Sequence, residues 1–157
     1  MTTYQQAIRS LIADLTPQPW DYTDSDGTTL TVIPASLTED PGAAEVNLRV
    51  TRDKTHAAQA AITTTDLPAL ITALSDPLTA PWEHEPHYPD GTPKGRVGTW
   101  LGDQYGLTLT PAEDGFTLTA IEDDGMVAAS VTLPPEQRLP LASALRRALD
   151  VAHGWER

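Results

Sequence analysis

The segment EVNLRVTR, residues 45–52, alternates apolar and polar side chains with the two-residue period of a half-buried β-strand. The turn sequence DKTH follows it, and AAQAAITT at 57–64 is the next expected strand, although alanine is a poor strand former. Upstream, the turn signal Asp26-Gly27 precedes TTLTVI at 28–33, which is rich in β-branched residues. Three antiparallel strands are therefore predicted in this part of the chain.

A short helix is predicted directly after these strands, over about 66–74. Asp66 is placed to cap its start, and Pro68 falls in the first turn, where a missing amide costs little. The segment LPALITALSD at 67–76 has an echo in LPLASALRRALD at 139–150. This echo predicts that one structural unit, three strands followed by a helix, occurs twice.

The second half of the chain repeats the order of elements expected in the first. YGLTLTPA at 105–112 and GFTLTAIE at 115–122 are two predicted strands, joined by the turn signal Glu-Asp-Gly. VAASVTL at 127–133 is the next strand, and the apolar stripe of 139–154 predicts a helix that ends near a glycine. A further strand is expected around 97–101.

The sequence predicts one domain that spans residues 1–157. Apolar residues at helical spacing mark an N-terminal helix at 3–15. The pseudo-repeat halves are about 20–75 and 97–153, and the proline- and glycine-rich segment 76–96 is the linker between them. The predicted fold class is α+β: an N-terminal helix followed by two βββα units, with a mainly antiparallel sheet and the helices packed on one face.

Duplicated units of several antiparallel strands followed by a helix resemble the arrangement of whirly and PC4-type single-stranded-DNA-binding proteins. The resemblance lies in the order of the elements, and it implies that a single nucleic-acid strand is bound on the sheet. Those families hold the strand with basic and aromatic residues, whereas here Phe116 is the only phenylalanine and the predicted strands carry little positive charge. No functional residue is therefore carried over, and nucleic acid is not the expected partner.

Acidic residues outnumber basic residues, and the formal net charge is −12. Every charged residue between Arg9 and Arg49 is acidic. Such a surface repels phosphate backbones, which disfavours ordinary nucleic-acid binding. It keeps a protein dispersed in solution, and it can also occupy the DNA-binding groove of a partner protein.

Cysteine is absent, which excludes disulfides, thiol nucleophiles and thiolate metal sites. No segment approaches the roughly 18 consecutive apolar residues of a membrane span, so no membrane partner is expected. The first residues lack the basic-then-apolar order of a signal peptide, and the protein is therefore expected in the cytoplasm.

The segment WEHEPHYPDG, residues 82–91, is the strongest candidate for chemistry. Its candidate metal ligands are His84 and His87, with Glu83 and Glu85 beside them. Imidazoles and carboxylates together can bind zinc or another divalent ion. The prolines of the segment exclude the helical His-Glu-x-x-His arrangement, and the alternative is a solvated linker without a metal. No catalytic residue and no cofactor are assigned.

Aromatic and basic side chains provide the candidate contacts to another protein, and these are Trp82, Tyr88, Trp100, Arg146 and Arg147. Sheet edges and a helix rich in alanine and leucine suit self-association, so a homodimer is expected. The two arginines can pair with the acidic N-terminal half, either within one chain or between two chains.

The first functional hypothesis is a small acidic non-catalytic protein that acts on another protein through its surface, as an accessory or regulatory factor like those of mobile genetic elements. In one form of this hypothesis, the protein blocks the nucleic-acid-binding site of its partner. The alternatives are a small metal-dependent enzyme that uses the loop of His84 and His87, and a single-stranded nucleic-acid-binding protein of whirly-like topology.

Overall fold

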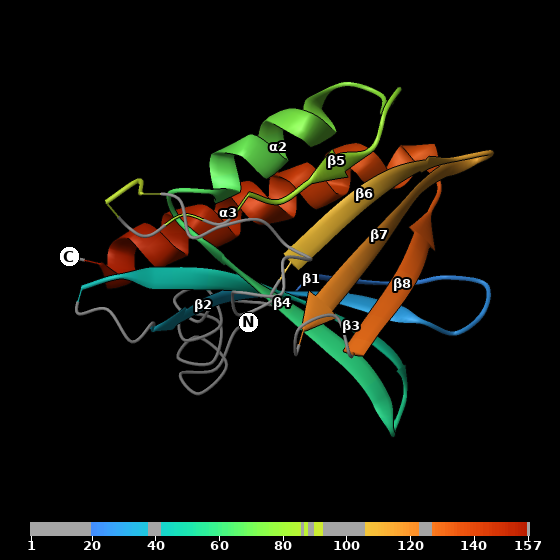
Figure 1. The fold of residues 1–157 in the computed structure, drawn as a ribbon, viewed down its shortest axis with the longest axis horizontal. Helices are drawn as coiled ribbons and strands as arrows, with labels where there is room; N and C mark the ends of the chain where they lie inside the picture. Colours follow the sequence, from blue (N-terminus) through green and yellow to red (C-terminus); the bar gives the residue numbers. More distant parts are fainter. Residues whose placement is uncertain are drawn as a thin grey trace, which may run out of the picture.

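The computed structural model describes residues 20–37, 42–85, 87, 90–92, 106–122 and 127–156. Within them the chain forms two antiparallel four-stranded sheets (Figure 1). The first sheet, in spatial order, consists of β1 (Trp20–Thr23), β2 (Thr29–Leu37), β3 (Ala44–Asp53) and β4 (His56–Thr63). The second consists of β5 (Trp82–Glu83), β6 (Gly106–Ala112), β7 (Gly115–Glu122) and β8 (Val127–Leu133). One helix follows each sheet: α2 (Leu67–Ser75) and, after the short 3₁₀ helix η1 (Pro135–Gln137), α3 (Arg138–Trp155).

The predicted α+β fold with two βββα units is wrong, because the described part of the chain is mostly β-structure and each sheet has four strands. The helices also do not share one face of a single sheet. Instead, α3 packs against β2 and β3 of the first sheet, and α2 packs against α3 (Figure 1). The helix expected at 3–15 and the strand expected around 97–101 lie outside the described residues.

The strands missing from the prediction are β1 and β5, which lie at the edges of their sheets. They have only four and two residues, so neither is long enough to display a clear two-residue period. Pairing with a longer neighbour holds them in place. Trp20 lies opposite Val32, and Trp82 lies opposite Leu109. Tertiary contacts therefore create these strands where local sequence is typical of loops.

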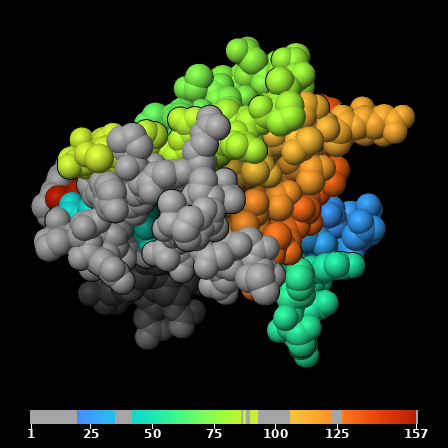
Figure 2. All heavy atoms as spheres, viewed as in Figure 1, coloured from blue at the N-terminus to red at the C-terminus, as the bar shows by residue number. Residues whose placement is uncertain are grey.

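Three hairpin tips project from the body of the molecule, between β1 and β2, between β3 and β4, and between β6 and β7 (Figure 2). In the first, Asp24 Oδ1 accepts hydrogen bonds from the N–H groups of Asp26 at 2.9 Å and Thr28 at 3.0 Å. In the last, Gly115 has a φ of +142°, and a Cβ there would overlap the carbonyl oxygen of Leu133. The tips are thus fixed by local hydrogen bonds and by a position that only glycine fits.

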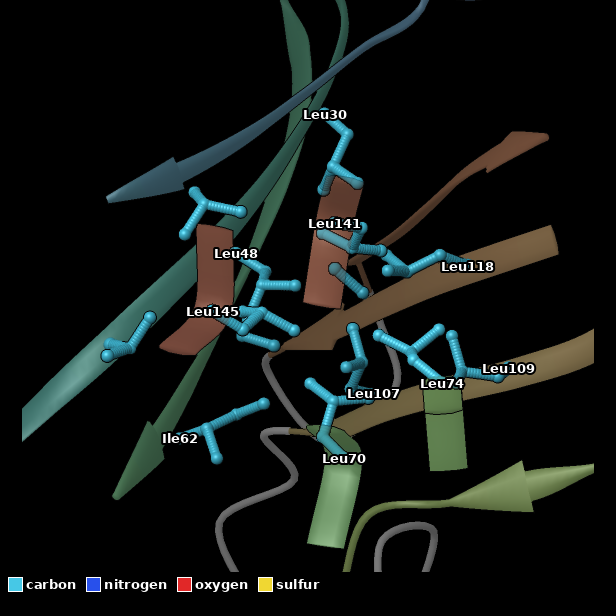
Figure 3. Close-up of a cluster of buried hydrophobic side chains, with 14 of the residues drawn as sticks. Leu30, Leu48, Ile62, Leu70, Leu74, Leu107, Leu109, Leu118, Leu141 and Leu145 are labelled. Atoms are coloured by element: carbon cyan, nitrogen blue, oxygen red, sulfur yellow. The ribbon is translucent and has the colours of Figure 1, made fainter. Parts of the chain in front are cut away.

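The hydrophobic core lies between the two sheets and the two helices (Figure 3). Each strand contributes alternate residues to it, as the two-residue period requires. Each fully buried leucine or isoleucine contributes about 1.5–3 kcal/mol relative to an exposed one. The side chains that meet in Figure 3 are Leu30, Leu48, Ile62, Leu70, Leu74, Leu107, Leu109, Leu118, Leu141 and Leu145, all with no exposed surface.

Polar contacts join the edge of the first sheet to the second sheet. The backbone N–H of Gln59 in β4 donates to Glu122 Oε2, at the end of β7, over 2.6 Å. The ring Nε2 of His56 donates to the carbonyl oxygen of Ala128 in β8 over 3.0 Å. The first of these bonds occupies a backbone N–H at the open edge of β4, which would otherwise be free to pair with another strand.

The ends of α3 are anchored by side chains. Arg138 Nη1 donates to the carbonyl oxygen of Leu74, at the end of α2, over 2.6 Å. At the other end, the carboxylate of Glu156 accepts from Thr64 Oγ1 at 3.0 and 2.9 Å and from the N–H of Ala44 at 3.2 Å. Helix α3 is thereby tied both to α2 and to the first sheet.

Helix α3 is amphipathic. Its core-facing stripe includes Leu141, Leu145 and Ala148, whereas Arg146 and Arg147 are exposed on the other side. Neither of the two described helices combines the length and the apolar character that crossing a bilayer requires.

Candidate functional site

A cavity of about 840 Å³ opens beside the start of α2, where the segment that follows β5 passes close to the helix. Its wall includes Asp66 at the start of α2, Trp82 and Glu83 of β5, and His84 and His87, which follow β5. The volume lies within the range of about 300–1,000 Å³ that is usual for binding cavities. The cavity brings together the histidines that the sequence singled out.

Asp66 is the centre of this site. Its Oδ2 accepts hydrogen bonds from His84 Nε2 at 3.1 Å and from the backbone N–H of His87 at 2.8 Å. Its Oδ1 accepts from His87 Nδ1 at 2.6 Å. The side chains of Asp66 and His84 are only 5% and 4% exposed, whereas that of His87 is 29% exposed. One buried carboxylate therefore holds the segment after β5 against the start of α2.

The environment of Asp66 favours its ionised form. Burial by itself raises the pKa of the carboxyl group, but the hydrogen bonds from His84 and His87 outweigh burial, and the pKa lies below its ordinary value. An ionised carboxylate is an acceptor only. Each imidazole must therefore carry a proton on the nitrogen that faces Asp66.

The second ring nitrogen of His84 has no such contact. Within the described residues, Nδ1 of His84 is buried and has no hydrogen-bond partner. A proton on Nδ1 would be buried with nothing to accept it, so the tautomer protonated on Nε2 fits the site, and Nδ1 carries a lone pair. The ring also stacks on Trp82, with the ring centroids 6.5 Å apart and the planes at 16°. The orientation of His84 is thus fixed from both sides.

Sequence reasoning missed the role of Asp66. The residue stands at the N-cap position of α2, as expected, but its side chain makes no capping hydrogen bond there. Only its backbone carbonyl oxygen takes part, by accepting from the N–H of Ala69 at 3.1 Å. No spacing rule connects Asp66 to His84 and His87, because their proximity depends on the pairing of β5 with β6.

The metal hypothesis gains no further ligand from the described residues. His84 and His87 do come together, but they converge on Asp66, and Glu83 and Glu85 are exposed on the rim of the cavity. In the part of the chain that the structure describes, no group of three or more histidine, aspartate or glutamate side chains is placed to hold a metal ion. A metal at His84, His87, Glu83 and Glu85 stays a prediction from the sequence.

The other candidate contact residues are dispersed. Trp82 is half-buried and lines the cavity. Arg146 and Arg147 are exposed on α3, and neither forms an ion pair with a described residue. Tyr88 and Trp100 lie outside the described residues. These five side chains therefore do not form one surface among the residues that the structure places.

The outward face of the second sheet is a regular array of hydroxyl groups. The register places Thr108 opposite Thr119 and Thr119 opposite Ser130. The next row is Thr110, Thr117 and Thr132. Neighbouring hydroxyls are hydrogen-bonded between Thr119 and Ser130 at 2.7 Å and between Thr117 and Thr132 at 3.2 Å. None of these six side chains carries a charge.

The outward face of the first sheet is also poor in positive charge. Its central cation is Arg49, whose Nε donates to Gln59 Oε1 over 2.9 Å. The aromatic rings of the described strands lie on the inner side. Phe116 is buried in the core, and Trp20, Tyr22 and Trp82 pack against it. Among the described residues, neither outward face therefore presents the combination of cations and rings that holds a single nucleic-acid strand.

Comparison with known proteins finds a similarity in fold and no match in sequence to a family model or a curated protein. Among solved structures, the chain is similar to the plant transcriptional regulator PBF-2, with a TM-score of 0.52 and 18% sequence identity. The similarity covers 89% of this chain and 94% of that chain. In fold, then, the chain is similar to a plant transcriptional regulator.

Proposed function

We propose that this chain is a non-catalytic accessory protein that binds another protein through its acidic surface. The observation that carries the proposal is the outward face of the second sheet, whose described residues present threonine and serine hydroxyls in place of cations and rings. Affinity for nucleic acid comes mainly from cations that neutralise phosphates. With Arg49 engaged by Gln59 and a net charge of −12, a basic protein surface is the better match.

The acidic side chains project where a partner can reach them. The β1–β2 tip carries Asp24 and Asp26, the β6–β7 tip carries Glu113 and Asp114, and both tips stand out from the body in Figure 2. No basic residue accompanies them at these two tips. Carboxylates on short, hydrogen-bonded hairpins lose little freedom on binding, which favours contact with a basic surface such as a nucleic-acid-binding site.

A second candidate function is single-stranded nucleic-acid binding. It is favoured by the fold that the chain shares with a plant transcriptional regulator and by the whirly-like order of elements expected from the sequence. An accessory role in the control of gene expression would be compatible with either candidate. The charge of the surface separates them, because only the second candidate requires contacts to phosphate.

The first experiment is affinity capture with chemical cross-linking in the native host. The bait is the wild-type protein, beside a variant neutralised at the tips by Asp26→Asn, Glu113→Gln and Asp114→Asn. A matched control keeps the charges with Asp26→Glu, Glu113→Asp and Asp114→Glu. We expect a partner on the wild type and on the control, and at least about a tenfold loss on the neutralised variant. A partner held equally by all three would refute binding through these carboxylates.

The second experiment titrates the protein with labelled single-stranded DNA and RNA at low salt and follows fluorescence anisotropy. We expect no binding. Binding that weakens steeply as salt is raised would overturn the proposal in favour of the nucleic-acid-binding candidate, because that slope counts the phosphates neutralised.

A further inference from the structure

We infer that the cavity at the start of α2 receives an arginine side chain of the partner protein. The inference rests on the proposed function, because it supposes a protein partner with a basic surface. It adds a specific pocket and a specific chemical group. The hydrogen-bonding groups that the cavity leaves unused determine which ligand it can bind.

The N–H donors that face Asp66 are already used in hydrogen bonds to its carboxylate. Asp66 takes the N–H of both imidazole rings and the backbone N–H of His87. What remains on the rings are the nitrogens that face away from Asp66. Nδ1 of His84 is buried and lies out of reach of a ligand, whereas Nε2 of the partly exposed His87 has no partner among the described residues. In a neutral ring this Nε2 is an acceptor, as is the exposed carboxylate of Glu83, so a ligand that satisfies them must bring N–H groups.

The charge of the wall selects a cation. Asp66 is ionised, and Glu83 adds an exposed carboxylate at the rim. No lysine or arginine lies among the described residues that line the cavity. An anionic ligand would meet these carboxylates without a compensating charge, which excludes phosphate and carboxylate groups. A divalent metal would lack a third protein ligand among the described residues.

The apolar part of the wall fits the stem of a long side chain. Trp82 is half-buried and lines the cavity together with Pro81 and Ala69. A guanidinium group stacks on an indole face with a gain of about 0.5–2 kcal/mol, and its methylene stem covers apolar surface. Its planar fork of five N–H donors can serve several acceptors at once, which a lysine ammonium does less well. Arginine therefore satisfies the acceptors, the charge and the indole together.

The test uses two synthetic peptides that differ in one group. One is an acetylated Gly-Ser-Gly-Arg-Gly-Ser-Gly amide, and its twin has citrulline, a neutral analogue of arginine, in place of the arginine. Each is titrated into the full-length ¹⁵N-labelled protein, and the NMR signals of the Trp82 indole and of the amides of Ala69 and His87 are followed. We expect these signals to shift with the arginine peptide, with half-saturation on the order of 1 mM, and not with the citrulline peptide.

Variants localise the effect. Glu83→Lys should weaken the arginine peptide at least about tenfold, and Trp82→Leu about fivefold. The control Glu136→Lys makes the same charge change on the exposed η1, away from the cavity, and should leave affinity within about twofold of wild type. A ¹⁵N spectrum of each variant with wild-type dispersion shows that it is folded.

Three outcomes overturn the inference. The first two are equal shifts with both peptides and no shift at the cavity with the arginine peptide. The third is weakening by Glu136→Lys to the same degree as by Glu83→Lys, because the site would then be general acidic surface. If the protein captures a partner but does not bind the arginine peptide, the proposed function stands and this inference is refuted. If it binds the arginine peptide at the cavity but captures no partner, the proposed function is refuted instead.

Discussion

Replacing Asp66 by alanine removes one acceptor that three hydrogen-bond donors share. The donors on His84 and His87 would then remain in a largely buried site without a partner. Breaking a buried, hydrogen-bonded charge cluster costs about 3–5 kcal/mol, and the partial exposure of His87 places this one at the lower end, at about 3 kcal/mol. With a urea m-value of about 2 kcal/mol/M, the unfolding midpoint should fall by about 1.5 M. Asp66→Asn keeps one oxygen acceptor and should lose only about 1 kcal/mol.

The pH dependence of this effect has a definite sign. The pKa of Asp66 is lowered in the folded protein, so folding favours the ionised carboxylate. The resulting stabilisation is complete above the pKa of an unfolded aspartate, about 3.9, and is lost as the pH falls through the folded pKa. The difference between the wild type and Asp66→Ala should therefore shrink as the pH falls below about 4.

Urea titrations followed by tryptophan fluorescence measure both effects. The control is Asp90→Ala, which removes an exposed carboxylate whose partner among the described residues is the nearby Thr92, and it should change stability by less than about 0.5 kcal/mol. A midpoint of Asp66→Ala within about 0.3 M of wild type at pH 7 would refute the role given to the carboxylate. A full difference that survives at about pH 2.5 would refute its electrostatic origin.

Three further substitutions test other parts of the structure. Gly115→Ala should cost about 2–4 kcal/mol, because the residue has a φ of +142° and its Cβ would overlap the carbonyl oxygen of Leu133; thermal unfolding measures the loss. Glu156→Gln should cost about 1 kcal/mol by weakening the contact with Thr64, and an unchanged urea midpoint would contradict this. Leu118→Ala empties a fully buried core position and should cost about 2–5 kcal/mol by urea titration, whereas a loss below about 1 kcal/mol would argue against the packing in Figure 3.

The sequence predicted strands where one face of a long strand is buried. The alternation at 45–52 lies within β3, whose inward residues Val46, Leu48 and Val50 have no exposed surface. It could not predict β5, because two residues cannot display a period and Trp82 takes its place by pairing with β6. The fourth strand of each sheet depends on tertiary contact, which is why the predicted fold class was wrong.

The site was predictable only in part. The spacing of His84 and His87 singled out the segment that lines the cavity, because two imidazoles so close together indicate chemistry. The carboxylate that organises them was assigned to a helix cap, since Asp66 stands at the start of α2 and no local pattern points from it to β5. Self-association and the contacts expected of Tyr88 and Trp100 stay predictions, because the described residues do not test them.

The packing of α3 also bears on how the protein is made in the cell. The inner face of the first sheet is complete once Ile62 has been added, but the leucines that cover it, Leu141 and Leu145, come roughly 80 residues later. At a synthesis rate of roughly 5–20 residues per second, that apolar face stays exposed for several seconds before α3 has been synthesised. A nascent chain of this kind is exposed to aggregation during the interval, so we expect chaperones to bind ribosomes stalled between Thr64 and Arg138 and to dissociate once α3 has emerged.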